Sequence, residues 1–423
     1  MRRLPLTDQL PYRFRRPRIV PFWSWVGRLY NRRLLRVGQR VEGLTVEGGD
    51  RLRDRLGRGD GILVAPNHSD HADPASMYEL GVRLGTPFYY MAAYQLFNGF
   101  NGWFLERIGA FPVDREGSDL SAFKAGVEIL AAGRHPLVVF PEGEIYYQAD
   151  RLTPIREGAA ALAATAVRKV PEGRNVWIVP VGIKYRFAEG HDPRPALERT
   201  MDDLEARLTW HPRPDLPIVD RVYRYAEALM GLKEFEILGE HRTGPLPGRL
   251  AALTATILDR VGDRRGVARR CEIAPVRIKE LRKACLDCLA DPATTPGQAD
   301  AIRRDLGELF IAVQLFSYPG NYVRQDPTLE RVAETLTKYE EDCLGTDVPR
   351  PKGPRRAIIQ VGEPIDVRAR VASAGKARLA LGALTAELEA AIQERLDAIG
   401  PGRPLDPAPK SVQAPAEASS SGA

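Results

Sequence analysis

The sequence lacks the features that would place a protein across a membrane or in an oxidising compartment. Its 423 residues contain no apolar run near the roughly 18 residues that a membrane-spanning helix needs, and no signal-peptide core follows Met1. The 4 cysteines are too few for a disulfide framework at this length. We therefore expect a cytoplasmic protein that is either soluble or peripheral on the inner face of the membrane.

Two common kinds of catalytic site are also missing from the sequence. No serine lies in a Gly-x-Ser-x-Gly turn that would expose a nucleophile. Cys285 and Cys288 have the spacing of half a zinc site, but no second pair of ligands lies nearby, so we expect buried thiols on a helix. His68, His71 and Asp73 lack the His-x-His-x-Asp-His spacing of metal hydrolases. The sequence thus predicts no metal and no resident cofactor.

Positive charge and aromatic rings are concentrated near the N-terminus. The net charge of the chain is +6, and arginines cluster at 13–18 and 32–33. Four aromatic residues lie among them: Phe22, Trp23, Trp25 and Tyr30. This combination suits a bilayer interface, where rings lie at headgroup depth and guanidinium groups meet anionic lipid. A helix packed on the protein with a solvated basic face has the same pattern, and the two interpretations are compatible.

Short apolar runs alternate with helix-periodic segments between residues 61 and 185. The expected strands are 62–66, 87–92, 110–113, 136–140 and 176–184, after an earlier strand at 44–47. The expected helices between them are 75–84, 99–108, 119–132 and 156–167. This alternation is typical of an α/β fold with a mostly parallel central sheet flanked by helices.

The pattern changes after residue 190. The next segment is charged and helix-periodic, and we expect no strand in it; a strand pattern returns at 357–361 and a helix follows at 378–399. We therefore expect a large helical insertion before the last strand, and a C-terminal tail rich in Pro, Ala and Ser. The expected divisions are an N-terminal segment at 1–60, an α/β core at 61–190, the insertion at 191–350, the rest of the core at 351–400 and a disordered tail at 401–423.

His68 and Asp73 follow the expected strand at 62–66. A rigid strand end fixes the geometry of catalytic groups, and α/β folds place their sites there. The carboxylate would bind the proton on one ring nitrogen of His68, which leaves the other nitrogen free to accept a proton from a substrate hydroxyl. Alone, such a pair is more often a helix cap or a structural hydrogen bond, so its meaning depends on the motifs that follow.

Three further motifs lie in order along the expected sheet: 109–115 and 139–143 at strand ends, and 178–183 within a strand. Together with the first motif they resemble the four sequence blocks of the glycerolipid acyltransferase family, which includes glycerol-3-phosphate and 1-acylglycerol-3-phosphate acyltransferases. Residues 361–365 resemble the last strand and turn of that family. The resemblance covers about 60–200 and 355–398, and it does not include the helical insertion.

The resemblance implies transfer of a fatty acyl group from acyl-CoA or acyl-carrier protein to a hydroxyl of a glycerol-phosphate or lysophospholipid-type acceptor. His68 would be the general base and Asp73 its orienter, with direct attack by the acceptor and no acyl-enzyme. Arg115 would bind an acceptor phosphate, and Glu142 and Gly143 would contribute to acceptor binding. The implied partners are the acyl thioester, the lipid acceptor and a membrane surface, with no nucleic acid.

The third block departs from the family pattern. There, Thr or Ser and then Arg usually follow Glu-Gly, whereas this chain has Glu144 and Ile145. An acid and an apolar residue thus replace a cation, although Arg151 and Arg156 are candidates to restore the charge. Two alternatives therefore stay open: an acyltransferase for a non-phosphate lipid or another hydroxyl or amine acceptor, and a non-catalytic lipid-binding protein on the same fold.

Overall fold

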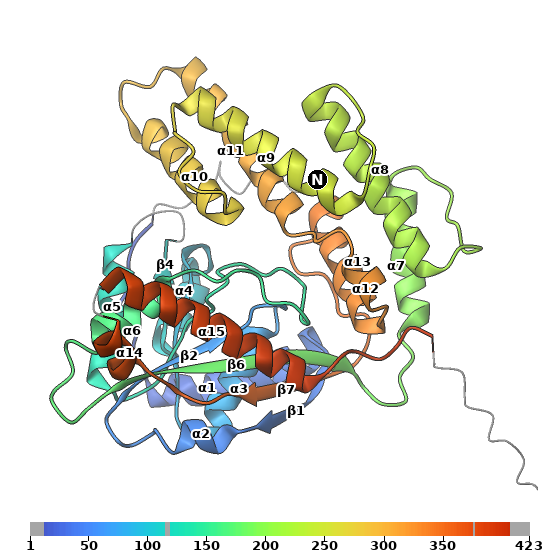
Figure 1. Cartoon of the computed structure of the whole chain (residues 1–423). Coiled ribbons are helices and arrows are strands. Elements are labelled where there is room, and N and C mark those ends of the chain that lie inside the picture. Colours follow the sequence, from blue (N-terminus) through green and yellow to red (C-terminus); the bar gives the residue numbers. More distant parts are fainter. Residues whose placement is uncertain (1–11, 115–118, 375–376, 407–423) are drawn as a thin grey trace, which may run out of the picture.

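A central sheet lies beneath a bundle of helices in the computed structural model, which describes residues 12–114, 119–374 and 377–406 (Figure 1). Within these residues the sheet has eight strands. They are β1 (Val41–Glu47), β2 (Gly61–Pro66), β3 (Tyr89–Ala93), β4 (Ala110–Val113), β5 (Leu137–Val138), β6 (Val176–Phe187), β7 (Arg355–Val361) and β8 (Ile365–Asp366).

The order of the strands across the sheet is β1-β7-β6-β2-β5-β3-β4, and β8 pairs with β6. The ladders β2–β5, β2–β6, β3–β4 and β3–β5 are parallel, as is β1–β7. Only β7 and β8 run antiparallel to β6. The predicted mostly parallel sheet is therefore confirmed, with β1, β7 and β8 running against the other strands.

Both faces of the sheet are covered at β2, which explains why this strand is apolar throughout. In β2, Leu63 and Ala65 belong to one hydrophobic cluster, whereas Ile62 and Val64 belong to the cluster on the opposite face. A strand with one wet face would instead alternate apolar and polar residues. The continuous apolar run is thus the sequence signature of a strand with helices on both sides.

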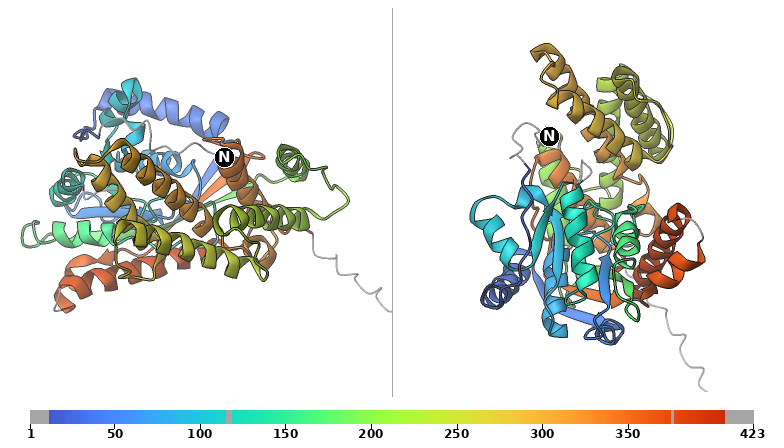
Figure 2. Two further views of the ribbon diagram at one scale, coloured as in Figure 1. Left: turned by 90° about the horizontal axis from the view of Figure 1, so that it is seen from above. Right: turned by 90° about the vertical axis from the view of Figure 1, so that its left-hand side faces the viewer.

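The core helices divide between these two faces. Those on the side of Ile62 are η1 (Leu34–Gly38, a π-helix), α2 (Gly49–Arg53), α3 (Asp73–Leu84) and α4 (Gly99–Arg107), and α1 (Pro21–Arg33) packs against α3. A 3₁₀ turn, η2 (Tyr94–Leu96), lies between β3 and α4. Those on the side of Leu63 are α5 (Leu120–Ala132), α6 (Gly158–Ala166), α14 (Val367–Ser373) and α15 (Ala377–Ile399). The views in Figure 2 show α1 in dark blue and the C-terminal helices in red on opposite sides of the sheet.

The helices between β6 and β7 form a region with its own hydrophobic cluster, which we call the helical region. It consists of α7 (Arg194–Arg207), α8 (Ile218–Leu238), α9 (Leu246–Arg265), α10 (Ala274–Ala290), α11 (Pro296–Phe316), α12 (Tyr322–Gln325) and α13 (Leu329–Leu344). All residues from 192 to 345 are described and none is in a strand, as predicted. Figure 1 shows this region above the sheet. Among all the described helices, none combines the length and the apolarity needed to cross a bilayer.

Charged side chains are buried inside the helical region. The Arg221 guanidinium is fully buried and donates to Glu198 at 2.8 Å, Asp202 at 2.6 Å and Glu205 at 2.7 Å. These bonds join α8 to α7, and removal of the cation would leave the buried Glu205 carboxylate with only the longer ion pair to Arg224, at 3.5 Å. On α10, Cys285 is buried, but Cys288 is exposed, so the expectation of two buried thiols is half wrong.

The chain after α15 returns to the helical region. The backbone N–H of Leu329 donates to Arg403 O at 2.8 Å, and Leu405 N–H donates to Pro327 O at 2.9 Å. Residues 401–406, which the sequence analysis placed in a disordered tail, are therefore ordered, because they pair with the start of α13. The rest of the predicted tail, 407–423, lies outside the described residues.

Candidate active site

The loops that carry the first and third motifs meet at one edge of the sheet. β2 and β5 are parallel neighbours, so the loops that follow them leave the sheet on the same side. The first loop ends where α3 begins with Asp73 and Pro74. Proline suits the first turn of a helix, and an acidic side chain is favoured at the positive end of the helix dipole. The local sequence thus places Asp73 near the C-terminal end of β2.

His68 and Asp73 contact each other directly. Nδ1 of His68 lies 3.0 Å from Oδ2 of Asp73, whose side chain is fully buried. Oδ2 also accepts the backbone N–H groups of Ser69 and Asp70, each at 2.8 Å, and Oδ1 accepts the Tyr185 hydroxyl at 2.9 Å. Burial raises the pKa of Asp73, while the donors around it act in the opposite direction. Because Asp73 engages Nδ1, Nε2 of His68 is the nitrogen left for a substrate.

The third motif supports His68 from the other side. The Phe140 ring stacks on the His68 imidazole with centroids 4.2 Å apart. Oε1 of Glu142 accepts the backbone N–H of His68 at 2.6 Å, and Oε2 accepts that of Thr153 at 3.0 Å. Burial raises the pKa of Glu142 to about 8, although these amides favour the ionised form. Glu142 therefore fixes the His68 backbone, while its predicted contact with an acceptor stays a prediction.

Gly143 has a backbone conformation that favours glycine and a close neighbour that excludes a side chain. Its φ is +79°, and a Cβ atom there would lie 2.9 Å from Cζ of Arg156. The backbone N–H of Arg156 donates to Pro141 O at 2.9 Å, which holds it beside the turn. Arg156 thus lies against the third motif, whereas Arg151 is exposed.

Arg115, the predicted phosphate ligand, lies outside the described residues. The structure follows the second motif only through β4 and Asp114. The role of Arg115 therefore stays a prediction from the resemblance alone.

Asn67 and Tyr185 are site residues that sequence reasoning missed. The Asn67 side chain joins the first motif to the fourth: Oδ1 accepts the Ile183 N–H at 2.7 Å, and Nδ2 donates to Ile183 O at 3.1 Å. Tyr185 lies two residues further along β6 and reaches Asp73. Neither gave a clear signal, because an asparagine after a strand and a tyrosine in an apolar strand are common.

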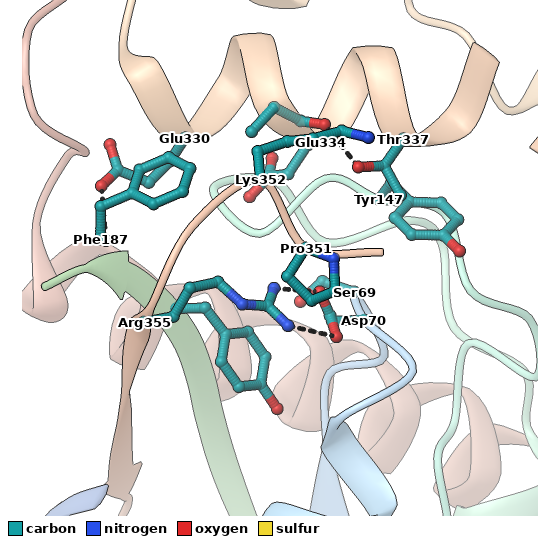
Figure 3. A pocket seen from close by; sticks show the side chains of 12 residues that line it. Ser69, Asp70, Tyr147, Phe187, Glu330, Glu334, Thr337, Pro351, Lys352 and Arg355 are labelled. Atoms are coloured by element: carbon teal, nitrogen blue, oxygen red, sulfur yellow. Dashed lines mark hydrogen bonds and ion pairs between the residues drawn. The ribbon is translucent and has the colours of Figure 1, made fainter. Parts of the chain in front are cut away.

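Asp70 is paired with an arginine from the last part of the chain. Nη1 of Arg355 donates to Oδ2 of Asp70 at 2.6 Å, and Figure 3 shows the two side chains pointing toward each other. Oδ1 of Asp70 accepts the Ala72 N–H at 2.8 Å. Burial alone would raise the pKa of Asp70, but the Arg355 guanidinium holds it below its ordinary value. Asp70 thus fixes the loop between His68 and Asp73.

The helical region contacts the loops of the site. A pocket between Ser69 and Asp70 on one side and α13 on the other is lined by Glu334 and Thr337 (Figure 3). Nε2 of Gln148, in the loop after the third motif, donates to Ser317 O at 2.7 Å. Further along that loop, the Ala149 N–H donates to Glu334 at 3.3 Å and the Asp150 N–H to the Tyr322 hydroxyl at 3.3 Å. The loop is therefore fixed by both regions of the molecule.

Comparison with known proteins matches the part of the chain that carries the four motifs. Residues 43–184 match the family model described as Acyltransferase. A stretch of 112 residues is 36% identical to the 1-acyl-sn-glycerol-3-phosphate acyltransferase of Streptococcus pneumoniae (strain ATCC BAA-255 / R6). This stretch covers 26% of this chain and 39% of that protein. A stretch of 124 residues is 33% identical to the protein of the same name from Bacillus subtilis (strain 168), which covers 28% of this chain and 59% of that protein. The chain thus spans less than two thirds of either relative.

Proposed function

We propose, from the premise that residues 43–184 form a domain of the acyltransferase family, that this chain transfers a fatty acyl group from a thioester to a lipid hydroxyl. The donor would be acyl-CoA or acyl-carrier protein, and the acceptor a glycerol-phosphate or lysophospholipid. The observation that carries the proposal is the contact between Nδ1 of His68 and the buried Asp73 carboxylate at 3.0 Å. This contact leaves Nε2 of His68 available to a substrate, and the His68 side chain is 14% exposed.

The reaction would proceed through direct attack. Nε2 of His68 accepts the proton of the acceptor hydroxyl as its oxygen attacks the thioester carbonyl carbon. The carbon–sulfur bond of the tetrahedral intermediate then breaks, and the leaving thiolate takes the proton back from Nε2. Asp73 stabilises the imidazolium that exists between these two steps, and Glu142 keeps the His68 backbone in place. No resident cofactor or metal is required by this chemistry.

Labelled palmitoyl-CoA, palmitoyl-acyl-carrier protein and a panel of acceptors test this proposal. The panel contains glycerol-3-phosphate, lysophosphatidate, other lysophospholipids and uncharged or amine-bearing lipids. We expect transfer to a phosphate-bearing acceptor and a loss of roughly 10²- to 10⁴-fold in His68→Ala. His211→Ala is the matched control, because His211 is exposed in the helical region. Full activity of His68→Ala would refute the mechanism, and preference for uncharged acceptors would support the alternative that Glu144 raises.

Two further measurements test whether a metal takes part and which thioester is the donor. Activity that persists after dialysis against a chelator is expected if no metal takes part. The ratio of kcat/KM for the two palmitoyl thioesters identifies the donor. Bound lipid without turnover on any donor and acceptor would instead support a lipid-binding protein.

The surface formed by α1 and α4 supports attachment to a membrane. The side chains of Phe22, Trp25 and Tyr30 on α1 are 61%, 56% and 59% exposed, and Phe100 on α4 is 72% exposed. Exposed arginines lie along the same helix: Arg28, Arg32 and Arg33. Apolar rings beside cations suit the headgroup layer of an anionic bilayer, in agreement with a location on the inner face of the membrane.

Sedimentation with vesicles tests this attachment. We expect binding to vesicles that contain phosphatidylglycerol, and weaker binding of the double variant Phe22→Ser/Trp25→Ser. Phe235→Ser is the matched control, because Phe235 is 66% exposed on α8, in the other region. Equal loss in both variants, or no loss in either, would contradict a membrane surface at α1.

A further inference from the structure

A second pocket lies where the loop after the third motif meets the helical region. The loop supplies Glu144 and Arg156, α10 supplies Lys279 and Arg282, and the wall is completed by apolar side chains that include Ile278 and Phe316. Lys279 and Arg282 are three positions apart on α10, so they lie on the same face of that helix. Two regions that are distant in sequence thus bring three cations to one pocket.

The pocket is lined by more cations than carboxylates. Three cations line it against one carboxylate, that of Glu144. Within the described part of the chain, neither Arg156 nor Lys279 forms an ion pair, and the Arg156 guanidinium packs on the Gly143 turn. Guanidinium groups match the geometry of phosphate oxygens, and an ammonium group adds a point charge. The pocket therefore favours an anion with several oxygens.

The apolar wall indicates that this anion belongs to a larger molecule. Ile278, Val313 and Phe316 line the same pocket, and the Phe316 ring contacts Tyr146 edge-on with centroids 6.4 Å apart. A free inorganic ion gains nothing from such a wall, whereas a phosphate attached to an alkyl or pantetheine chain buries carbon there.

The pocket lies beside the third motif of the candidate active site. Arg156 packs on Gly143, and the preceding residue, Glu142, accepts the backbone N–H of His68 at 2.6 Å. The pocket and His68 therefore share one short turn at the same edge of the sheet. A molecule whose phosphate occupies the pocket could extend along this turn toward His68.

We infer that Arg156, Lys279 and Arg282 bind the phosphate group of one of the two substrates, so that the helical region completes the substrate site. These residues would supply the cations that the third motif lacks after Gly143. The inference rests on the proposed function for the identity of the substrates. The phosphate comes either from the acceptor, such as lysophosphatidate, or from the CoA or phosphopantetheine part of the donor, and the experiment separates the two.

The double variant Lys279→Ala/Arg282→Ala tests the inference. We expect KM to rise roughly tenfold or more for one phosphate-bearing substrate, because hydrogen bonds to charged groups are lost, and little change in KM for the other. A rise for lysophosphatidate assigns the pocket to the acceptor, and a rise for palmitoyl-CoA assigns it to the donor. Lys283→Ala/Arg304→Ala is the matched control, because it removes two exposed cations from α10 and α11.

Binding separates this inference from the proposed reaction. Each variant is combined with His68→Ala, so that no turnover occurs. Calorimetric titration with lysophosphatidate and with CoA then measures the affinity of each ligand. Weaker binding of one ligand in Lys279→Ala/Arg282→Ala, but not in the control, supports the pocket even if no transfer is detected. Unchanged binding of both ligands would overturn the inference, and it would leave the role of His68 intact.

Discussion

The α/β core and the helical region use buried charge in opposite ways. In the core, buried charged groups gather at the strand ends, where Asp73 and Glu142 fix His68. In the helical region, buried charges join helices to one another, as Arg221 joins α8 to α7. The family match covers the first region and ends before the second. The difference teaches that buried charge fixes the candidate site in one part of the chain and holds helices together in the other.

The largest expected effect lies in the core. Asp73→Asn removes the negative charge that stabilises the protonated His68 imidazole, so we expect kcat to fall by roughly 10²- to 10⁴-fold. Palmitoyl transfer measures the effect, and circular dichroism checks that the protein is folded. Asp54→Asn, an exposed acid in the same region, should keep full activity. Equal activity of Asp73→Asn and wild type would show that the pair is only structural.

The next effect concerns the stability of the helical region. Arg221→Met leaves the buried Glu205 carboxylate with only the longer ion pair to Arg224 at 3.5 Å, and we expect it to lower the free energy of unfolding by about 3 kcal/mol. Urea unfolding measures this change. The control is Arg303→Ala, which breaks an exposed pair with Asp300 and should cost less than about 1 kcal/mol. A similar loss of stability in the two variants would show that the buried ion pairs of Arg221 contribute no more than an exposed pair.

Each region also contains a carboxyl group whose pKa is raised to about 8: the buried Glu142 in the core and the half-buried Glu334 in the helical region. The ordinary value is 4.5, so between these values the folded protein binds more protons than the unfolded chain. The free energy of unfolding therefore falls as the pH rises through this window. Glu142→Gln should remove its share of that decline, and its Tm relative to wild type should increase between about pH 5 and about pH 8.5.

Thermal unfolding at several pH values checks this expectation. Glu334→Gln should behave in the same way, because burial is the cause at both positions. Glu189→Gln, at an exposed glutamate, should show a constant difference from wild type. A constant difference for Glu142→Gln as well would mean that its carboxyl group is not perturbed by burial.

The smallest effect is expected where the two regions meet. Gln148→Ala removes the side-chain bond to Ser317 O, so it should cost about 1 kcal/mol in stability. The loop that it holds leads away from the third motif, so we also expect a modest rise in KM for the substrate bound by the second pocket. Urea unfolding and the palmitoyl transfer assay measure these changes. A large loss of kcat would contradict the expectation that this loop affects substrate binding and not the chemical step.

Much of the fold could be predicted because β2 is apolar on both faces and apolar runs alternate with helical segments after it. The run at 61–66 predicted β2, and the alternation that follows it predicted the parallel sheet. The orientation of β1 and β7 could not be predicted, because strand direction depends on the long connection between β6 and β7. β8 and α14 were missed, because a strand of two residues leads directly into a helix capped by Asp366.

The candidate site was predictable only where its residues are close in sequence. The five-residue spacing of His68 and Asp73 predicted their contact, which the structure contains. Tyr185 and Arg355 lie 112 and 285 positions away from the carboxylates they contact, and no local pattern predicts such pairs. Arg156 could be named as a candidate from the sequence, but its position against Gly143 depends on how the loop folds back.

The bond between Arg355 and Asp70 sets the order in which the site is completed during synthesis. A nascent chain that has emerged through β6 carries all four motifs, yet the arginine that fixes the loop between His68 and Asp73 is still to be translated. The ribosome must first produce the whole helical region. The loop therefore gains its Arg355 partner only after the helical region has been translated, so the ion pair forms late in synthesis, well after the four motifs have emerged.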